Sequence, residues 1–165
     1  MFITRIFNKI AADFRGEALR SELGKKDEKK INDRKVLRLI QKGADLKGTD
    51  WIGNTALHWA IYSKKKEAIL AMIDKGADIN QQNVRGETAL LAALWFQVDD
   101  VVPILLEKGA RTDLRDAMGN GAESLALAFS KADLASQIRT VYEQQTGERS
   151  YARARARSFE RAGGW

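Results

Sequence analysis

The sequence Gly43-Ala44-Asp45 recurs 33 residues later as Gly76-Ala77-Asp78, and after another 33 residues as Gly109-Ala110-Arg111. The same step connects Gly53-Asn54-Thr55-Ala56-Leu57-His58 with Gly86-Glu87-Thr88-Ala89-Leu90-Leu91. A period that is kept over three copies predicts a stack of one supersecondary unit, because each unit buries its apolar face only against its neighbours. We therefore expect a solenoid.

These motifs resemble the ankyrin repeat, whose unit is a β-turn followed by two short antiparallel helices. In that family Thr-Pro-Leu-His leads into the first helix and Gly-Ala-Asp follows the second. Thr55-Ala56-Leu57-His58 is the better copy, Thr88-Ala89-Leu90-Leu91 lacks the His, and Gly121-Ala122-Glu123-Ser124 has lost the Thr, Leu and His. The resemblance covers roughly residues 32–144. It implies an all-α ankyrin-repeat solenoid of helix-turn-helix units with β-turn fingers, an extra N-terminal helix and a C-terminal capping helix.

The repeat phase also divides the chain into segments. We expect an N-terminal amphipathic helix and linker (1–31), a capping half-repeat (32–49), two ankyrin repeats (50–82 and 83–115), a degenerate C-terminal capping repeat (116–144) and a basic Arg/Ala tail (145–165). Atypical units at both ends are typical of a solenoid, because a terminal unit has to present a polar outer face to water.

Composition limits the class of protein. At 165 residues and 44% hydrophobic content, the chain is long enough to bury a continuous core. No apolar run approaches the ~20 residues of a spanning helix, and the start of the chain lacks the apolar region of a secretory signal. The absence of Cys excludes disulfides and fits a reducing compartment. We expect a cytoplasmic location, or the host-cell cytosol for a secreted effector.

The net charge of +6 belongs to the two ends of the chain. Residues 1–31 carry eight Lys/Arg and five Asp/Glu, and residues 145–165 carry five Arg and two Glu, so each end contributes +3. The segment between them carries fifteen of each sign and is neutral. This distribution argues against a basic groove along the repeats.

One unit can be read residue by residue. We expect Thr55 to cap the first helix and the small Ala60 to let the neighbouring unit approach closely. A second helix is expected from about Lys66 to Lys75, and Gly76 stands where a left-handed residue ends a helix. In the next unit we expect Asp99 to cap the second helix, which would place Pro103 within its tolerant first turn.

The two ends allow more than one interpretation. The apolar residues of the N-terminal stretch fall on one helical face, which fits packing on the first repeat, a membrane-surface helix or a partner-binding helix. The tail, with Arg153, Arg155 and Arg157 alternating with Ala, is read as a solvated extension or as a contact for an acidic partner or nucleic acid.

Catalysis is not expected from this sequence. His58 is the only His and lies in the turn motif, where the resemblance implies a structural role, hydrogen bonding between neighbouring turns. No second His or Cys can share a metal ion with it, so we expect no metal site and no cofactor. The pair Asp99-Asp100 precedes a helix, where capping and interaction with the helix dipole explain it.

The resemblance also implies a binding face. In ankyrin arrays the turn tips and the ends of the first helices line the concave side of the stack. Large apolar residues recur at these positions here, and Trp and Tyr are preferred at interface hot spots. The candidate partner-binding residues are Trp51, Ile52, Tyr62, Val84, Arg85, Trp95, Phe96, Met118 and Phe129.

The leading hypothesis is a non-enzymatic protein-protein interaction module that binds a partner protein of unknown identity through this concave face. The resemblance is compatible with an adaptor, an inhibitor or a host-directed bacterial effector. The alternative is a membrane- or nucleic-acid-associated protein that acts through its basic termini, with the repeats as scaffold. A third hypothesis is self-association of the short solenoid through its apolar surface.

Overall fold

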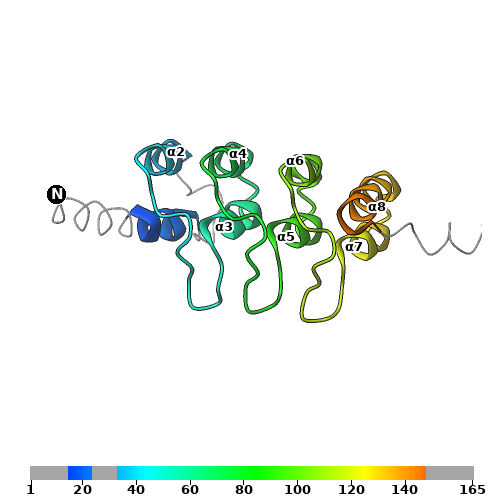
Figure 1. Ribbon diagram of the computed structural model, residues 1–165. Helices are drawn as coiled ribbons and strands as arrows, with labels where there is room; N and C mark the ends of the chain where they lie inside the picture. Colours follow the sequence, from blue (N-terminus) through cyan, green and yellow to red (C-terminus); the bar gives the residue numbers. More distant parts are fainter. Residues whose placement is uncertain (1–14, 24–32, 148–165) are drawn as a thin grey trace, which may run out of the picture.

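The computed structural model describes residues 15–23 and 33–147 of the chain. Two rows of helices run side by side along a solenoid, and three loops, which we call fingers, extend from one edge of the stack (Figure 1). The described residues contain helices and isolated β-bridges but no strand. This architecture confirms the expected all-α repeat solenoid with β-turn fingers.

The helices alternate between an inner row, next to the fingers, and an outer row (Figure 1). The inner row holds a helical segment over residues 15–23 and then α3 (Ala56–Tyr62), α5 (Ala89–Trp95) and α7 (Ala122–Ala128). The outer row holds α2 (Asp33–Gln41), α4 (Lys66–Asp74), α6 (Val102–Glu107) and α8 (Ala132–Thr146). Along the inner row α3 packs on α5 and α5 on α7, and each of these three helices also packs on the outer helix that follows it.

Local chemistry fixes where the helices begin and end. Thr55 and Thr88 cap α3 and α5, each accepting a hydrogen bond from the backbone N–H three residues on. After α2, α4 and α6, the chain leaves the helix through a glycine with positive φ, as at Gly76 (φ 79°). The expected cap at Thr55 and left-handed Gly76 are thus confirmed.

The core is a continuous apolar layer between the two rows. Ala60, Ala93 and Ala126 occupy the same place in three successive inner helices and are fully buried. Large apolar side chains from both rows fill the space around them, among them Leu57, Ile61, Leu90, Leu94, Met72 and Leu105. The small alanines let neighbouring inner helices approach closely, as the 33-residue phase predicted.

The expected cap at Asp99 is wrong. Residues Asp99–Val101 form a 3-10 helix, η2, and α6 follows with Val101 at its N-cap and no side-chain cap. The Asp99 carboxylate instead pairs with Lys131. Pro103 does lie in the first turn of α6, where its missing N–H has no partner to lose.

The first outer helix, α2, has an inner partner. Leu19 and Leu23 of the helical segment 15–23 are fully buried in the common core, and the Ser63 hydroxyl donates to the Leu23 carbonyl at 2.7 Å. The segment thereby takes the inner-row position ahead of α3 (Figure 1). The N-terminal apolar stretch and the Arg/Ala tail of the sequence analysis lie outside the described residues.

The last unit departs from the repeat at its outer helix. Where α4 and α6 are followed by Gly76 and Gly109, the corresponding residue is Tyr142, so α8 continues to Thr146. The Gln145 side chain then accepts from Thr112 N–H at 3.1 Å and donates to the Ala110 carbonyl at 2.8 Å. The longer helix therefore satisfies backbone groups that would otherwise face water at the end of the stack. None of the helices in residues 15–23 and 33–147 is long and apolar enough to cross a membrane.

Candidate functional site

The three fingers are joined to one another through their backbones. The first finger spans residues 49–55, the second 82–88 and the third 115–121. Val84 N–H donates to the Ile52 carbonyl at 2.9 Å, and Ala117 N–H donates to the Arg85 carbonyl at 2.8 Å. Gly86 has φ of 70°, and a Cβ there would lie 2.9 Å from Ala117 N. The finger tips therefore form one connected edge, and only glycine fits where the second finger meets the third.

Each finger is closed by one side-chain oxygen near its start. Asp50 Oδ1 accepts from the backbone N–H groups of Ile52 and Asn54, at 2.9 and 2.8 Å. Asp116 does the same in the third finger, and Asn83 does so in the second. Burial acts to raise the pKa of Asp50 and Asp116, but hydrogen bonds from backbone and side-chain donors hold both pKa values below the usual range. Both carboxylates therefore remain ionised at neutral pH.

The second finger has its carboxylate four residues later, at Glu87. This side chain is buried, and its Oε2 accepts from Tyr62 OH at 3.0 Å, from Asn83 Nδ2 at 2.9 Å and from Arg85 Nε at 3.0 Å. Arg85 also lies over the Tyr62 ring, 5.9 Å from its centroid. Burial and the neighbouring Glu87 raise the pKa of Tyr62. The phenol is therefore a fixed donor at neutral pH.

The aromatic residues at the ends of the inner helices form two clusters. In the first, the Tyr62 ring lies 4.7 Å from the Phe96 ring and 5.6 Å from the Trp59 ring, between centroids. In the second, Trp95 and Phe129 meet edge to face at 5.8 Å. Rings in contact hold one another in place, so the clusters present a preorganised surface.

The finger tips are the most exposed apolar part of the described chain. Trp51 is 90% exposed, Met118 80% and Val84 69%. At the helix ends the exposure is smaller, 36% for Trp95 and 37% for Phe96. Contiguous apolar surface at this level marks interaction sites in soluble proteins.

The candidate residues therefore fall into three groups. Trp51, Val84 and Met118 stand out from the finger tips, with Ile52 less exposed beside them. The second group consists of the residues of the aromatic clusters, Tyr62, Trp95, Phe96 and Phe129. Two of them, Tyr62 and Phe129, are half-buried against the core. Arg85 is exposed but paired with Glu87.

One aromatic residue of this face was missed by the sequence analysis. Trp59 lies half-buried on α3, and its Nε1–H donates to Asp50 Oδ2 at 3.0 Å. Trp95, in the register of Tyr62, donates its Nε1–H to Asp116 Oδ2 in the finger of the next unit at 3.3 Å. Trp59 precedes Tyr62 by three residues on one helix, a spacing that places both on one face and could have revealed it.

His58 has the structural position that the resemblance implied. Its Nε2–H donates to the Glu87 carbonyl at 3.0 Å, and its Nδ1 accepts from Thr55 N–H at 3.2 Å. This pattern requires the neutral imidazole, and burial lowers the pKa of His58 accordingly. The described part of the chain also contains no group of three or more His, Cys, Asp or Glu side chains that could hold a metal ion.

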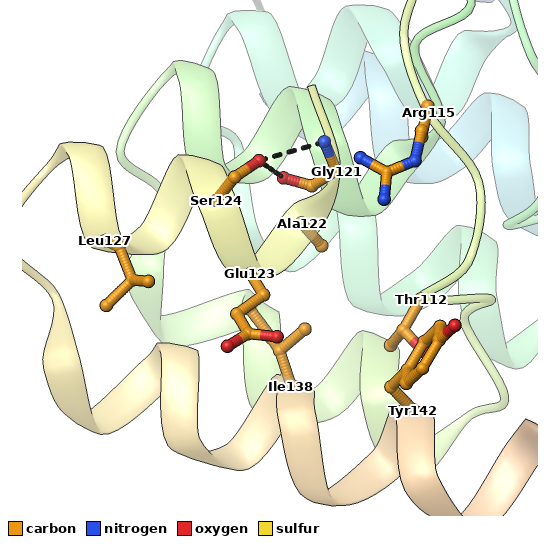
Figure 2. A pocket seen from close by; sticks show the side chains of 9 residues that line it. All are labelled: Thr112, Arg115, Gly121, Ala122, Glu123, Ser124, Leu127, Ile138 and Tyr142. Carbon is orange, nitrogen blue, oxygen red and sulfur yellow. Dashed lines mark hydrogen bonds between the residues drawn. The ribbon is translucent and has the colours of Figure 1, made fainter. Parts of the chain in front are cut away.

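A pocket of about 380 Å³ lies at the C-terminal end of the stack, between α7, α8 and the third finger (Figure 2). Glu123 occupies the register of the buried Leu90 and forms an ion pair with Arg139. Ile138, Tyr142 and the half-exposed Leu127 leave an apolar wall beside it. The pocket thus lies at a surface that is packed in the middle of the stack but is left open in the last unit. The ion pair between Glu123 and Arg139 covers part of it.

Comparison with known families agrees with this geometry. A family model described as ankyrin repeats, with three copies, matches residues 29–116, which is slightly more than half of the chain. The match ends at the start of the third finger, so α7 and α8 continue the stack beyond it. No curated protein matches this chain in a sequence comparison.

Proposed function

Because the chain belongs to the ankyrin repeat family, we propose that it is a non-enzymatic module that binds a partner protein through its fingers and inner helices. Ankyrin repeats are generally protein-protein interaction modules. The proposal is carried by one observation, the row of exposed apolar tips at Trp51, Val84 and Met118 beside two fixed aromatic clusters. Burying these side chains supplies free energy, and the rigid stack limits the entropy lost on binding.

The test is capture of partners from a lysate by the full chain and by the variant Trp51→Ala/Trp95→Ala. We expect the double variant to lose the proteins that the unmodified chain retains, while its circular dichroism and melting temperature change little. Leu127→Ala is the matched control, because it removes an exposed apolar side chain from the C-terminal end face instead. Equal retention by the double variant, correctly folded, would show that this face is not the site.

A module of this kind suits an adaptor, an inhibitor or an effector that an intracellular bacterium delivers into a host cell. Each of these roles requires a rigid recognition surface and no chemistry of its own. The cysteine-free composition fits work in a reducing cytoplasm, of the producing cell or of a host.

A second candidate function rests on the distribution of charge. Each end of the chain carries a net +3 while the repeats are neutral, which favours contact of the ends with an anionic membrane or with nucleic acid. Deleting residues 1–14 or 150–165 separates the two proposals. Loss of vesicle or nucleic-acid binding in the deletions would support the ends, and retained partner capture would support the finger face.

A further inference from the structure

The first outer helix, α2, carries a row of exposed basic side chains. Arg34, Arg38 and Lys42 follow one another at intervals of four residues, and all three are exposed. Lys42 N–H donates to the Arg38 carbonyl at 3.0 Å, so the last turn of the helix includes Lys42. This spacing places the three side chains on one side of α2, opposite the buried Val36 and Ile40. We call these three residues the α2 stripe.

The corresponding positions of the next two outer helices are not basic as a group. In the 33-residue register they hold Glu67, Ala71 and Lys75 on α4, and Asp100, Ile104 and Lys108 on α6. The α2 stripe therefore carries three positive charges where each of the two following helices has a net charge of zero. Because α4 and α6 take the same place in the repeat with these residues, repeat packing does not require Arg34 or Arg38.

Two features of the stripe oppose the stability of its own helix. Arg34 lies in the first turn of α2, where the positive end of the helix dipole disfavours a cation. Like charges four residues apart on a helix also repel one another. Ion pairs do not relieve this repulsion, because within residues 15–23 and 33–147 the carboxylates of the outer row pair with other cations, Lys65, Lys66, Lys108 and Lys131. The charges of the stripe therefore indicate an anionic partner outside the stack.

The sequence around the stripe distinguishes between anionic partners. Residues 25–42 contain eight Lys/Arg and three Asp/Glu, and basic clusters on the order of four to eight charges bind anionic lipid headgroups. Such a cluster also attracts nucleic acid. Residues 1–14, however, contain three Phe and three Ile and lead directly into the helical segment 15–23, the inner partner of α2. Apolar side chains add to the binding of a membrane surface but have no role on a phosphate backbone, so the combination favours a membrane.

We infer that the α2 stripe binds the anionic headgroups of a membrane surface. The inference rests on the second candidate function, contact of the basic ends with an anionic surface, and assigns to it a membrane and three residues of the first repeat. The outer row and the fingers lie at opposite edges of the stack (Figure 1). A chain bound through the α2 stripe therefore leaves the finger tips open to a partner protein.

The test is co-sedimentation of the full chain with large unilamellar vesicles of phosphatidylcholine, either alone or with about 30 mol % phosphatidylserine. We expect the anionic vesicles to bind the chain at least about tenfold more tightly than the neutral ones. Arg34→Gln/Arg38→Gln should weaken binding to the anionic vesicles about tenfold, because two charges are removed from the headgroup contact. Added salt should weaken binding of the unmodified chain more than binding of this variant, because salt screens the charges that the variant lacks.

The matched control is Lys64→Gln/Lys75→Gln. It removes the same charge from two exposed positions of the second repeat, and Gln97 already occupies the register of Lys64 in the third. The control should bind the anionic vesicles as the unmodified chain does. Arg34→Gln/Arg38→Gln should melt no lower than the unmodified chain, since it relieves repulsion on α2.

Three results would overturn the inference. The first is equal weakening of vesicle binding by the two double variants, and the second is equal affinity of the chain for neutral and anionic vesicles. The third comes from titrating the same proteins with a DNA duplex. If Arg34→Gln/Arg38→Gln weakens duplex binding while the unmodified chain binds no vesicles, the stripe contacts nucleic acid and the inference is wrong.

Failure of this inference is distinguishable from failure of the candidate function on which it rests. If deleting residues 1–14 abolishes vesicle binding while Arg34→Gln/Arg38→Gln does not weaken it, the end of the chain contacts the membrane and the stripe does not. If Arg34→Gln/Arg38→Gln weakens vesicle binding while the deletions of residues 1–14 and 150–165 leave it unchanged, the stripe is the membrane site and the function proposed for the ends is wrong. Capture of partners by Trp51→Ala/Trp95→Ala tests the finger face independently of both.

Discussion

The first and second fingers have the same backbone turn, but their carboxylates occupy positions of the repeat that differ by four residues. In the first finger the acid is Asp50 and the amide is Asn54; in the second the amide is Asn83 and the acid is Glu87. Either Asp or Asn can supply the single oxygen that closes the turn. The turn does not use the second polar atom of that side chain, which is an oxygen in Asp and a nitrogen in Asn. Whether this atom accepts or donates a hydrogen bond therefore depends on the neighbouring side chains, which differ between the fingers.

Those surroundings explain the exchange. In the first finger, Asp50 Oδ2 faces two donors, Trp59 Nε1 and Asn54 Nδ2, so an acceptor is required there. In the second finger, Asn83 Nδ2 donates to the buried Glu87, so a donor is required. Asp50 and Asn83 thus hold the same position in the repeat and close the same turn. Their contacts with neighbouring side chains explain why one is a carboxylate and the other an amide.

The largest expected effect comes from forcing the pattern of the first finger onto the second. Asn83→Asp places a carboxylate against Glu87, and we expect the free energy of unfolding to fall by about 3 kcal/mol because two buried like charges meet. The double variant Asn83→Asp/Glu87→Asn copies the first finger and should recover at least about 1 kcal/mol of that loss. Urea unfolding of Asn83→Asp, Glu87→Asn and the double variant measures these values, and strictly additive losses would contradict the proposed opposition of the two carboxylates.

The second and third fingers differ in the space around their glycines. Gly86→Ala combines a positive φ with a Cβ 2.9 Å from Ala117 N, so we expect a loss of about 2–3 kcal/mol. Gly119→Ala has a similar φ of 83° but no atom within 4 Å of the added Cβ, and should cost only about 1 kcal/mol. Thermal melts of both variants decide the matter. Equal losses of stability in the two variants would mean that the second and third fingers can move apart to admit a Cβ at little cost.

The helix after the first finger, α3, carries His58 where the helix after the second finger, α5, has Leu91, and we expect His58→Leu to cost about 1.5–2 kcal/mol through two lost hydrogen bonds. The folded pKa of His58 lies below its ordinary 6.5, so the unfolded chain takes up the proton first as the pH falls. The contribution of His58 to stability is therefore complete above about pH 6.5 and is lost progressively below it.

Stability measured from pH 8 to pH 5 should accordingly decrease in the unmodified chain and change little in His58→Leu. The loss due to Asp50 and Asp116, whose folded pKa values lie below 3.8, begins at lower pH and is shared by both proteins. Parallel pH curves between pH 8 and 5 would argue against a buried neutral imidazole.

The smallest effect is expected at the end of the stack, where Glu123 occupies the register of Leu90. Glu123→Ala should cost about 0.5 kcal/mol, because its ion pair with Arg139 is largely exposed and screened by water. Leu90→Ala removes a fully buried side chain from the middle of the stack and should cost about 3 kcal/mol. Similar losses in urea unfolding would show that the end unit is not a cap.

Much of the fold could be predicted from the sequence because the same local interactions recur in each 33-residue unit. Thr55 and Thr88 cap helices, Gly76 ends one and Ala60 permits close packing, each through chemistry confined to a few neighbouring residues. The cap at Asp99 could not be predicted, because its carboxylate pairs with Lys131 in the next unit. A contact 32 residues away competes with a local one, and local pattern carries no information about it.

The proposed binding face shows the same division. The 33-residue step located the exposed tips, since a turn tip has no neighbour to bury it. It did not reveal that Tyr62 and Phe129 are half-buried, or that Trp59 belongs to the face. Those outcomes depend on which rings of adjacent helices meet.

The sequence by itself determined the period, the order of the helices and the residues at the finger tips, because each follows from interactions within one unit. Only the tertiary structure decided that Glu87 is buried among Tyr62, Asn83 and Arg85, and that Trp59 and Asp50 share a pocket with the helical segment 15–23. These arrangements join groups from different units, and their energies depend on distance and burial, which become defined only when the units stack.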